Sequence, residues 1–90
     1  MAVTIHLSSL LRDFSRVPEF ELEAQTVRAA LAEMARRYPS LHRGICDETG
    51  AVRRHVNVWV NRHNIRDAKG LDTPLAPGDV VMILQAVSGG

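Results

Sequence analysis

Three stretches of the chain alternate hydrophobic and polar residues with the period of two that is typical of a strand with one buried face. They cover residues 3–8, 20–24 and 56–60. A polar break at residues 12–16 separates the first two, so we expect these strands to form a hairpin. A fourth stretch, residues 80–87, is apolar on both faces, which predicts a strand in the middle of a sheet or one whose outer face is covered.

A single helix is predicted between the second and third strands. Apolar residues recur at helical spacing from Val27 to Tyr38, and Thr26 stands where an N-cap is expected. Pro39 should end this helix, because the residue before a proline avoids the helical conformation. The cap lacks the glutamate or glutamine of a capping box, since the third helical position holds Ala29.

Residues 40–54 are predicted to form an irregular connection. They contain Gly44 and Gly50 and no apolar periodicity long enough for a second full helix. Leu41 and Ile45 should anchor this connection to the core. Without a second helix the pattern argues against a ferredoxin-like fold, which requires two.

The chain after the third strand is predicted to turn back on itself. A tight turn at residues 61–63 leads to a short return strand near Ile65 and Arg66, and residues 70–79 then form a loop. Two strands, one helix and two or three further strands follow one another in the order of a β-grasp. This is an α+β fold in which a mixed sheet of four to five strands wraps one main helix. The first and last strands can pair in parallel, because the helix supplies the crossover between them.

Composition and charge indicate one small domain without a strong electrostatic field. The 90 residues are 46% hydrophobic and 23% charged, which suits one globular domain at residues 1–87 followed by a flexible tail, residues 88–90. The net charge of +1 argues against nucleic acid and membrane surfaces as partners. The longest apolar run, residues 80–84, is too short to span a membrane. With one cysteine and no visible signal peptide, we expect a cytoplasmic protein that is monomeric when free.

The last two residues, Gly89 and Gly90, are the candidate functional site. A pair of glycines after a buried strand places a free carboxylate on a tether without side chains, which can enter a channel too narrow for any Cβ atom. The three residues after Val87 extend roughly 10 Å at most, which suits delivery of the carboxylate into another protein's active site. Terminal glycines are also common without any function, and on composition alone this plainer explanation is the more frequent one.

Several short motifs accompany this order of elements. They are Val56-Asn57-Val58-Trp59-Val60-Asn61, Asn64-Ile65-Arg66, Gly70-Leu71-Asp72-Thr73-Pro74-Leu75, Gly78-Asp79 and Ala86-Val87-Ser88-Gly89-Gly90. Together with the β-grasp order they resemble the ThiS/MoaD family of ubiquitin-like sulfur carriers, and within it the carriers called CysO. The resemblance covers the whole chain and is densest in its second half. Ala29 departs from the acidic residue that is common near this point of the family's helix.

The resemblance implies that the chain is a protein cosubstrate and not an enzyme. A partner adenylyltransferase related to ubiquitin-activating enzymes, often with a rhodanese domain, would use ATP to convert the Gly90 carboxylate into an acyl adenylate. Sulfur would then replace AMP and leave a thiocarboxylate on Gly90. A downstream synthase, of cysteine synthase or thiazole synthase type, would pass this sulfur to an acceptor on the way to cysteine, a thiosugar, molybdopterin or a thiazole. No cofactor is expected on the chain itself.

The expected docking surface lies on the outer face of the sheet. If core-facing residues alternate along the last strand, Met82, Leu84 and Ala86 face outward, and Trp59 on the neighbouring strand would lie beside Leu84. An exposed tryptophan in an apolar patch is typical of an interface hot spot, and the resemblance implies docking through this face. The alternative is that residues 40–54 fold over the patch. The predicted partner-binding residues are Trp59, Met82, Leu84, Ala86, Val87 and Arg66.

The sequence leaves two other functions open and offers two weaker candidate sites. The chain could be a ubiquitin-like modifier joined through Gly90 to target lysines, with self-branching limited to Lys69, or a scaffold or enzyme subunit whose glycines are incidental. His42 and Cys46 have the spacing of two ligands on one helical face, but no further ligand pair stands at metal-site spacing, so no metal site is predicted. No base is placed by the sequence to activate Cys46 as a nucleophile.

Overall fold

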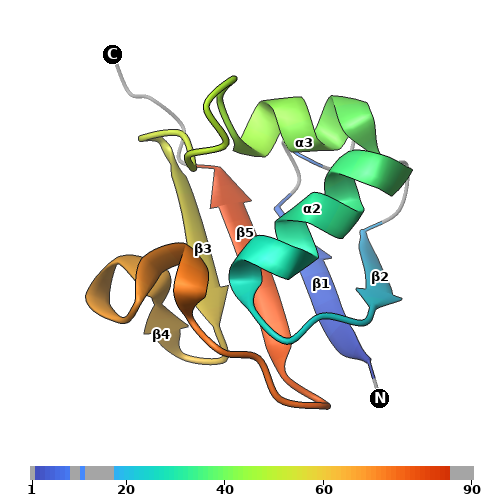
Figure 1. Cartoon of the computed structure of the whole chain (residues 1–90), viewed down its shortest axis with the longest axis vertical. Helices are drawn as coiled ribbons and strands as arrows, with labels where there is room; N and C mark the ends of the chain where they lie inside the picture. Colours follow the sequence, from blue (N-terminus) through green and yellow to red (C-terminus); the bar gives the residue numbers. More distant parts are fainter. Residues whose placement is uncertain (1, 9–10, 12–17, 86–90) are drawn as a thin grey trace.

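The computed structural model describes residues 2–8, 11 and 18–85, which form a mixed five-stranded sheet with two helices packed on one of its faces (Figure 1). The strands are β1 (Val3–Leu7), β2 (Glu19–Leu22), β3 (Val56–Val60), β4 (His63–Asn64) and β5 (Val80–Gln85). Their order across the sheet is β2-β1-β5-β3-β4. β1 and β5 pair in parallel, and all other neighbours pair antiparallel. The predicted β-grasp architecture with a mixed sheet is confirmed.

The two strands at the start of the chain form the predicted hairpin. Val3 pairs with Leu22 and Ile5 pairs with Phe20, so the apolar side chains of both strands share one face of the sheet. The strand boundaries differ slightly from the prediction, since β1 ends at Leu7 and β2 is displaced toward the N-terminus.

β5 lies in the middle of the sheet, as its apolar pattern predicted. On one side Val81 pairs with Ile5, and on the other side Ile83 pairs with Val58. Val81 and Ile83 are buried, because both face the helices. A strand with neighbours on both sides and a helix layer over one face needs apolar residues throughout its inner face.

The main helix, α2 (Val27–Arg37), begins and ends close to the predicted positions. Thr26 caps it, because the Thr26 hydroxyl oxygen accepts a hydrogen bond from the Ala29 amide at 3.1 Å. The helix ends at Tyr38, whose backbone is not helical (φ −134°, ψ 71°) and whose amide makes the last hydrogen bond of the helix, to the Met34 carbonyl oxygen at 2.7 Å. The ring of Tyr38 lies 4.8 Å from that of Phe20 on β2, which ties the helix end to the hairpin.

The expectation of an irregular connection over residues 40–54 is wrong for its first part, which forms a second helix, α3 (Pro39–Ile45). Pro39 ends α2 and also opens α3, since a proline at the first helical position sacrifices no hydrogen bond. Leu41 and Ile45, one turn apart, are completely buried and anchor the segment as predicted. A helix of seven residues needs only this one apolar pair to pack against the core. The sequence prediction missed it because it required a longer apolar periodicity.

The return strand is also displaced from its predicted place. β4 is His63–Asn64, whereas Ile65–Asp67 forms a 3-10 turn and Gly70–Asp72 forms another. The Asn64 side chain accepts a hydrogen bond from the Arg66 amide at 2.9 Å, and this local bond ends the strand by starting the turn.

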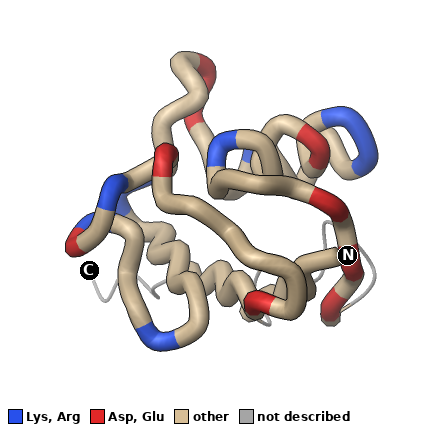
Figure 2. The backbone as a smooth tube through the Cα atoms, turned by 60° about the horizontal axis from the view of Figure 1, so that its bottom comes forward, with Lys and Arg blue, Asp and Glu red and all other residues tan. Residues whose placement is uncertain are grey.

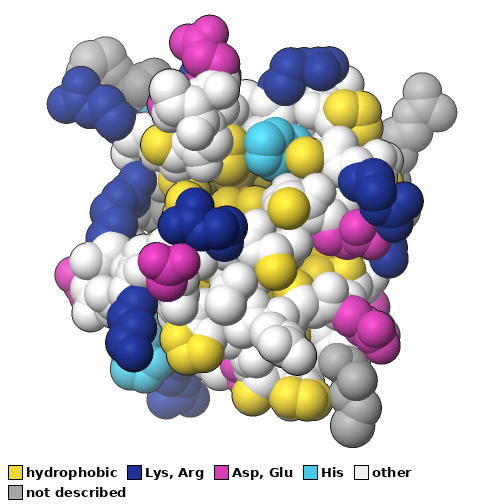
Figure 3. Space-filling model, in the orientation of Figure 1, with side chains coloured by type: hydrophobic (Ala, Val, Ile, Leu, Met, Phe, Trp, Pro, Cys, Tyr) yellow, Lys and Arg dark blue, Asp and Glu magenta, His cyan; other side chains and the backbone are white. Residues whose placement is uncertain are grey.

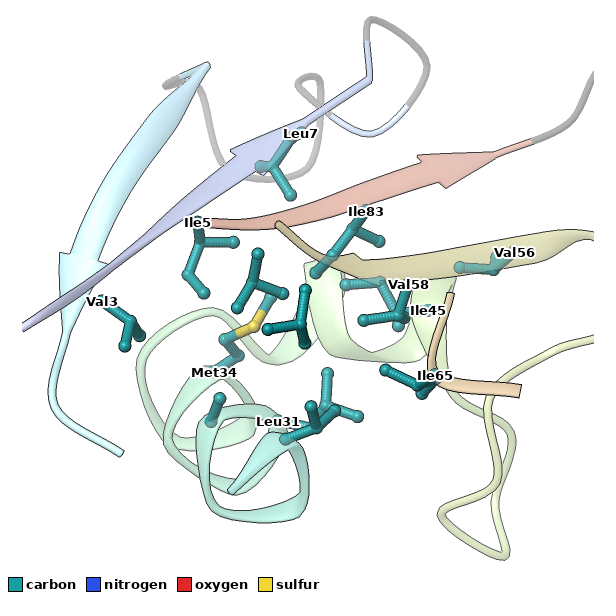
Figure 4. Close-up of a cluster of buried hydrophobic side chains, with 14 of the residues drawn as sticks. Val3, Ile5, Leu7, Leu31, Met34, Ile45, Val56, Val58, Ile65 and Ile83 are labelled. Carbon is teal, nitrogen blue, oxygen red and sulfur yellow. The ribbon is translucent and has the colours of Figure 1, made fainter. Parts of the chain in front are cut away.

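The core lies between the sheet and the helix layer. Figure 4 shows side chains from β1, β3 and β5 pointing toward those of α2 and α3. Met34 of α2 is fully buried in this cluster, and Ile65 of the first 3-10 turn closes one edge. The two helices therefore cover the inner face of the sheet and leave the outer face to solvent among the described residues.

Removal of the helix cap tests this account of α2. We expect Thr26→Ala to lower the free energy of unfolding by about 1 kcal/mol, because the Ala29 amide then loses its acceptor. Urea denaturation measures the change, and Thr26→Ser, which keeps a hydroxyl, should stay close to the parent protein. Equal losses in both variants would contradict the cap.

Candidate functional site

The outer face of the sheet carries an apolar patch on its two central strands. Met82 and Leu84 of β5 are 37% and 36% exposed, whereas Val81 and Ile83, which alternate with them, are buried. Trp59 of β3 shares this face and is half-buried. We call Trp59, Met82 and Leu84 the outer patch. It is the place where the sequence predicted partner-binding residues.

The register changes one detail of the predicted patch. Trp59 pairs with Met82, and Leu84 pairs with Asn57. Trp59 and Leu84 are therefore diagonal neighbours and not directly opposite each other, because the antiparallel pairing is set by the buried residues of the two strands. A large indole ring still reaches a diagonal neighbour at this spacing.

The segment 40–54 does not lie over the outer patch. Its anchors Leu41 and Ile45 are buried in the core on the helix side of the sheet, and Figure 1 shows α3 beside α2 on that side. The helix side itself has a different character, since Figure 3 shows hydrophobic surface there broken up by charged and neutral side chains. The patch on the sheet is thus open among the described residues.

β5 leads the chain out of the middle of the sheet. Its last residue, Gln85, pairs with Val56 and donates its amide hydrogen to the Ser8 hydroxyl oxygen at 3.2 Å. The predicted functional residues Ala86, Val87, Gly89 and Gly90 lie outside the described residues. The structure therefore defines where the terminal segment is attached, which is directly beyond the outer patch on the same strand.

Arg66 is brought to the end of β3 that lies beside Gln85. Its guanidinium donates hydrogen bonds to the carbonyl oxygens of Val56, at 2.9 Å, and of Arg53, at 3.2 Å. It also donates to the Asn57 side-chain oxygen. Three acceptors from one strand end hold this planar group in place. Arg66 thereby links the 3-10 turn to the start of β3 while its side chain lies at the protein surface.

Asn57 and Asn64 complete this polar cluster, and the sequence prediction did not single them out. The Asn64 amide donates to the Asn57 side-chain oxygen at 3.3 Å, so that this oxygen receives hydrogen bonds from both Asn64 and Arg66. The Asn-X-Arg spacing could have signalled the turn, because asparagine side chains accept hydrogen bonds from amides two residues ahead. Nothing in the sequence signals the contact with Asn57.

Cys46, the candidate nucleophile, lies at the end of α3 in the helix layer. Cys46 is 2% exposed, and burial, followed by the charge of Asp47, raises the pKa of its thiol, although Arg53 acts in the opposite direction. A raised pKa keeps the thiol protonated, which is unfavourable for both nucleophilic attack and metal binding. Within the described part of the chain, no three side chains of His, Cys, Asp or Glu lie together as a metal site would require.

Charge and hydropathy add two further observations. Figure 2 shows acidic and basic residues interspersed along the described backbone, without a wide region of one sign. None of the helices formed by the described residues has the length and apolar character needed to cross a bilayer.

The match to a known family covers nearly the whole chain. The model of the ThiS family matches residues 5–90. This range begins within β1, includes the other four strands completely and continues to Gly90. The chain belongs to the ThiS family. The predicted resemblance is therefore confirmed.

Several curated proteins and solved structures are similar to the chain over nearly their full length. The sulfur carrier protein CysO of Mycobacterium tuberculosis is 31% identical over 93 aligned residues, which cover the whole of both proteins. A chain in the BexX/CysO complex of Amycolatopsis orientalis has a TM-score of 0.89 and 29% identity, over 99% of this chain and 100% of that one. Small archaeal modifier protein 1 of Methanosarcina acetivorans has a TM-score of 0.85 and 33% identity, over 99% of this chain and 96% of that one.

The bonds of Arg66 can be tested by substitution. We expect Arg66→Met to lower the free energy of unfolding by about 1 kcal/mol, because the carbonyl groups of Val56 and Arg53 lose a charged donor. Arg62→Met, in the exposed turn at the other end of β3, should change it by less than about 0.5 kcal/mol. Chemical denaturation of both variants measures the difference, and equal values would show that the cluster is not structural.

Proposed function

We propose that this member of the ThiS family is a cytoplasmic sulfur carrier that works through a thiocarboxylate on Gly90. The observation that carries the proposal is the continuation of the family match to Gly90, directly beyond the central strand β5. A carboxylate is a poor electrophile, and adenylation by ATP supplies a good leaving group. The ATP is bound and consumed by a partner adenylyltransferase, so the carrier needs no cofactor of its own.

The sulfur-transfer step can be written with all bonds accounted for. The terminal sulfur of a persulfide on the activating enzyme, or on a rhodanese-like partner, attacks the Gly90 carbonyl carbon and expels AMP. A second thiol of the donor then cleaves the sulfur–sulfur bond, which leaves the thiocarboxylate on Gly90 and a disulfide on the donor. In a downstream synthase this sulfur attacks the biosynthetic acceptor, of cysteine, thiosugar, molybdopterin or thiazole type. Water then hydrolyses the bond between the sulfur and the Gly90 carbonyl carbon, which leaves the sulfur on the acceptor and regenerates the carboxylate.

The described residues support a cosubstrate and not a catalyst. The thiol of Cys46 is buried with a raised pKa, and the exposed outer patch is apolar. In this proposal the outer patch, together with Ala86, Val87 and Arg66, docks the carrier so that Gly89 and Gly90 enter the partner's active site. Glycines suit such a narrow channel because they have no Cβ atom.

Conjugation to other proteins is the second candidate function. It is favoured by the 33% identity to a protein called a small archaeal modifier. In this case the activated Gly90 carbonyl is attacked by a lysine amine of a target, with loss of the activating group and formation of an amide. The chain itself offers Lys69, an exposed residue before the second 3-10 turn.

The mass of the intact carrier tests the thiocarboxylate. After incubation with ATP, a sulfide or persulfide donor and the activating enzyme, we expect part of the protein to gain the mass difference between sulfur and oxygen. The gain should be absent when the chain lacks Gly90. Full adenylation with no sulfur incorporation would contradict the carrier proposal.

Cell extracts distinguish the alternative function. Conjugation predicts many higher-mass adducts of a tagged carrier that disappear when Gly90 is deleted and resist thiols and hydroxylamine, because an isopeptide bond is stable to both. A carrier that transfers only sulfur gives no such higher-mass adducts.

Charge placed in the outer patch tests docking. We expect Leu84→Lys and Met82→Lys each to raise the KM of the activating enzyme for the carrier about tenfold, because a buried interface position must then accommodate an ammonium group. Ala68→Lys, which adds the same charge at an exposed position just after the first 3-10 turn, should leave the KM unchanged. Equal effects at all three sites would indicate a general charge effect and contradict docking through the patch.

A further inference from the structure

A groove lies between the edge strand β2 and helix α2, away from the outer patch. It has a volume of about 720 Å³ and runs from the end of the strand to the last turn of the helix. On the strand side it is lined by Glu21, Leu22 and Glu23. On the helix side it is lined by Ala29 and Ala32 and, toward the end of the helix, by Glu33, Arg36 and Arg37. The two alanines leave room beside the strand that longer helical side chains would occupy.

The backbone of β2 is oriented to accept another strand. β2 is the outermost strand, so one of its edges has no neighbouring strand among the residues that the structure describes. The Leu7 amide donates a hydrogen bond to the Pro18 carbonyl oxygen, so Leu7 and Pro18 form a hydrogen-bonded pair. Such pairs alternate with non-hydrogen-bonded pairs along two antiparallel strands, so the Ile5–Phe20 pair is hydrogen-bonded too. The peptide groups of Glu19 and Glu21 therefore point away from β1, toward the open edge.

The acidic and the apolar side chains of β2 lie on opposite sides of the sheet. Glu19, Glu21 and Glu23 are exposed, and Glu19 and Glu21 face the outer side of the sheet. On that side the Glu19 carboxylate oxygen lies 3.4 Å from the imidazole Nε2 of His6 on β1. Phe20 and Leu22 face the helix side. Figure 2 shows acidic residues on both sides of the start of the chain, where this edge lies.

Arg37 covers part of the open edge. Its guanidinium donates to the Glu21 carbonyl oxygen at 3.2 Å and to the Glu33 carboxylate at 3.0 Å. Arg36 binds the same carboxylate through two hydrogen bonds, and these two arginines, led by Arg36, lower the pKa of Glu33 to about 2. Glu33 is thus ionised at any physiological pH and holds Arg37 in place whether or not the arginine contacts the strand.

We propose that this groove binds an extended segment of a partner protein as a sixth strand, antiparallel to β2, in which basic and apolar residues alternate. The basic side chains lie opposite the glutamates on the outer side, since opposite charges on directly paired residues stabilise a sheet. The apolar side chains enter the groove over Leu22, Ala29 and Ala32. Arg37 releases the Glu21 carbonyl oxygen to a partner amide and stays bound to Glu33.

Charge complementarity selects this occupant over a second copy of the chain. If two β2 strands paired antiparallel about Glu21, the two Glu21 side chains would face each other, and Glu19 of each copy would face Glu23 of the other. Like charges at directly opposite positions are destabilising. Five paired residues span roughly 17 Å of strand, so a short segment is sufficient.

Titration of the protein with a synthetic peptide of alternating lysine and valine tests the proposal. We expect shifts of the backbone amide NMR signals of residues 19–23 and of Ala29 and Ala32, with binding that weakens as salt is added. A peptide of alternating glutamate and valine should not bind. Shifts confined to the outer patch, no shifts at millimolar peptide, or equal binding of the acidic peptide would each overturn the proposal.

Three variants and one control locate the site. Glu21→Lys should weaken peptide binding about fivefold through loss of a cross-strand charge pair and gain of repulsion, whereas Glu48→Lys, the same change in a distant loop, should alter it only slightly. Arg37→Ala should tighten binding, because the edge is uncovered. Ala32→Trp fills the groove from an exposed helical position and should abolish binding while the circular dichroism spectrum is retained. Unaltered affinity in Glu21→Lys and Ala32→Trp would refute the site, and Gly90 chemistry is untouched by either result.

Discussion

The parallel pairing of β1 with β5 is the interaction on which the rest of the structure depends. It places the last strand of the chain between the first strand and β3, so that β5 is hydrogen-bonded along both sides. A parallel neighbour requires a crossover, and α2 supplies it by passing over the inner face. The helix layer, the buried face of β5 and the exposed face with Met82 and Leu84 all follow from this one pairing.

The two faces and the two edges of the sheet have separate roles in this arrangement. The inner face is filled by α2 and α3, and the outer face carries the apolar patch beside the point where the terminal segment begins. The β2 edge is separated from β3 by β1 and β5, and glutamates and Arg37 form its surface. A partner that holds the carrier by the sheet face therefore leaves the β2 edge accessible.

Sequence periodicity predicted the parts of the fold that depend on one long pattern. The hairpin, α2 with its Thr26 cap and the central position of β5 were all found in this way. α3 was missed because one buried pair, Leu41 and Ile45, is too short to show a period. β4 was misplaced because a side-chain hydrogen bond of Asn64, and not hydrophobicity, ends the strand.

The site was predictable only where it follows from alternation. The outward direction of Met82 and Leu84 is a consequence of the strand period, but which residue of β3 lies opposite each of them depends on register, which no local pattern fixes. The bonds from Arg66 to Val56 and Asn57 likewise depend on how the chain returns after β4. The groove at β2 exists because two small residues of α2 face an edge strand that is close only in space.

The central position of β5 also has a mechanical consequence. A catalyst that draws the end of the chain into a channel pulls along this strand, and the load is shared in shear by hydrogen bonds to β1 on one side and β3 on the other. An edge strand would instead be peeled away one bond at a time. In the proposed function, repeated insertion and withdrawal of the terminal segment would therefore leave the domain folded.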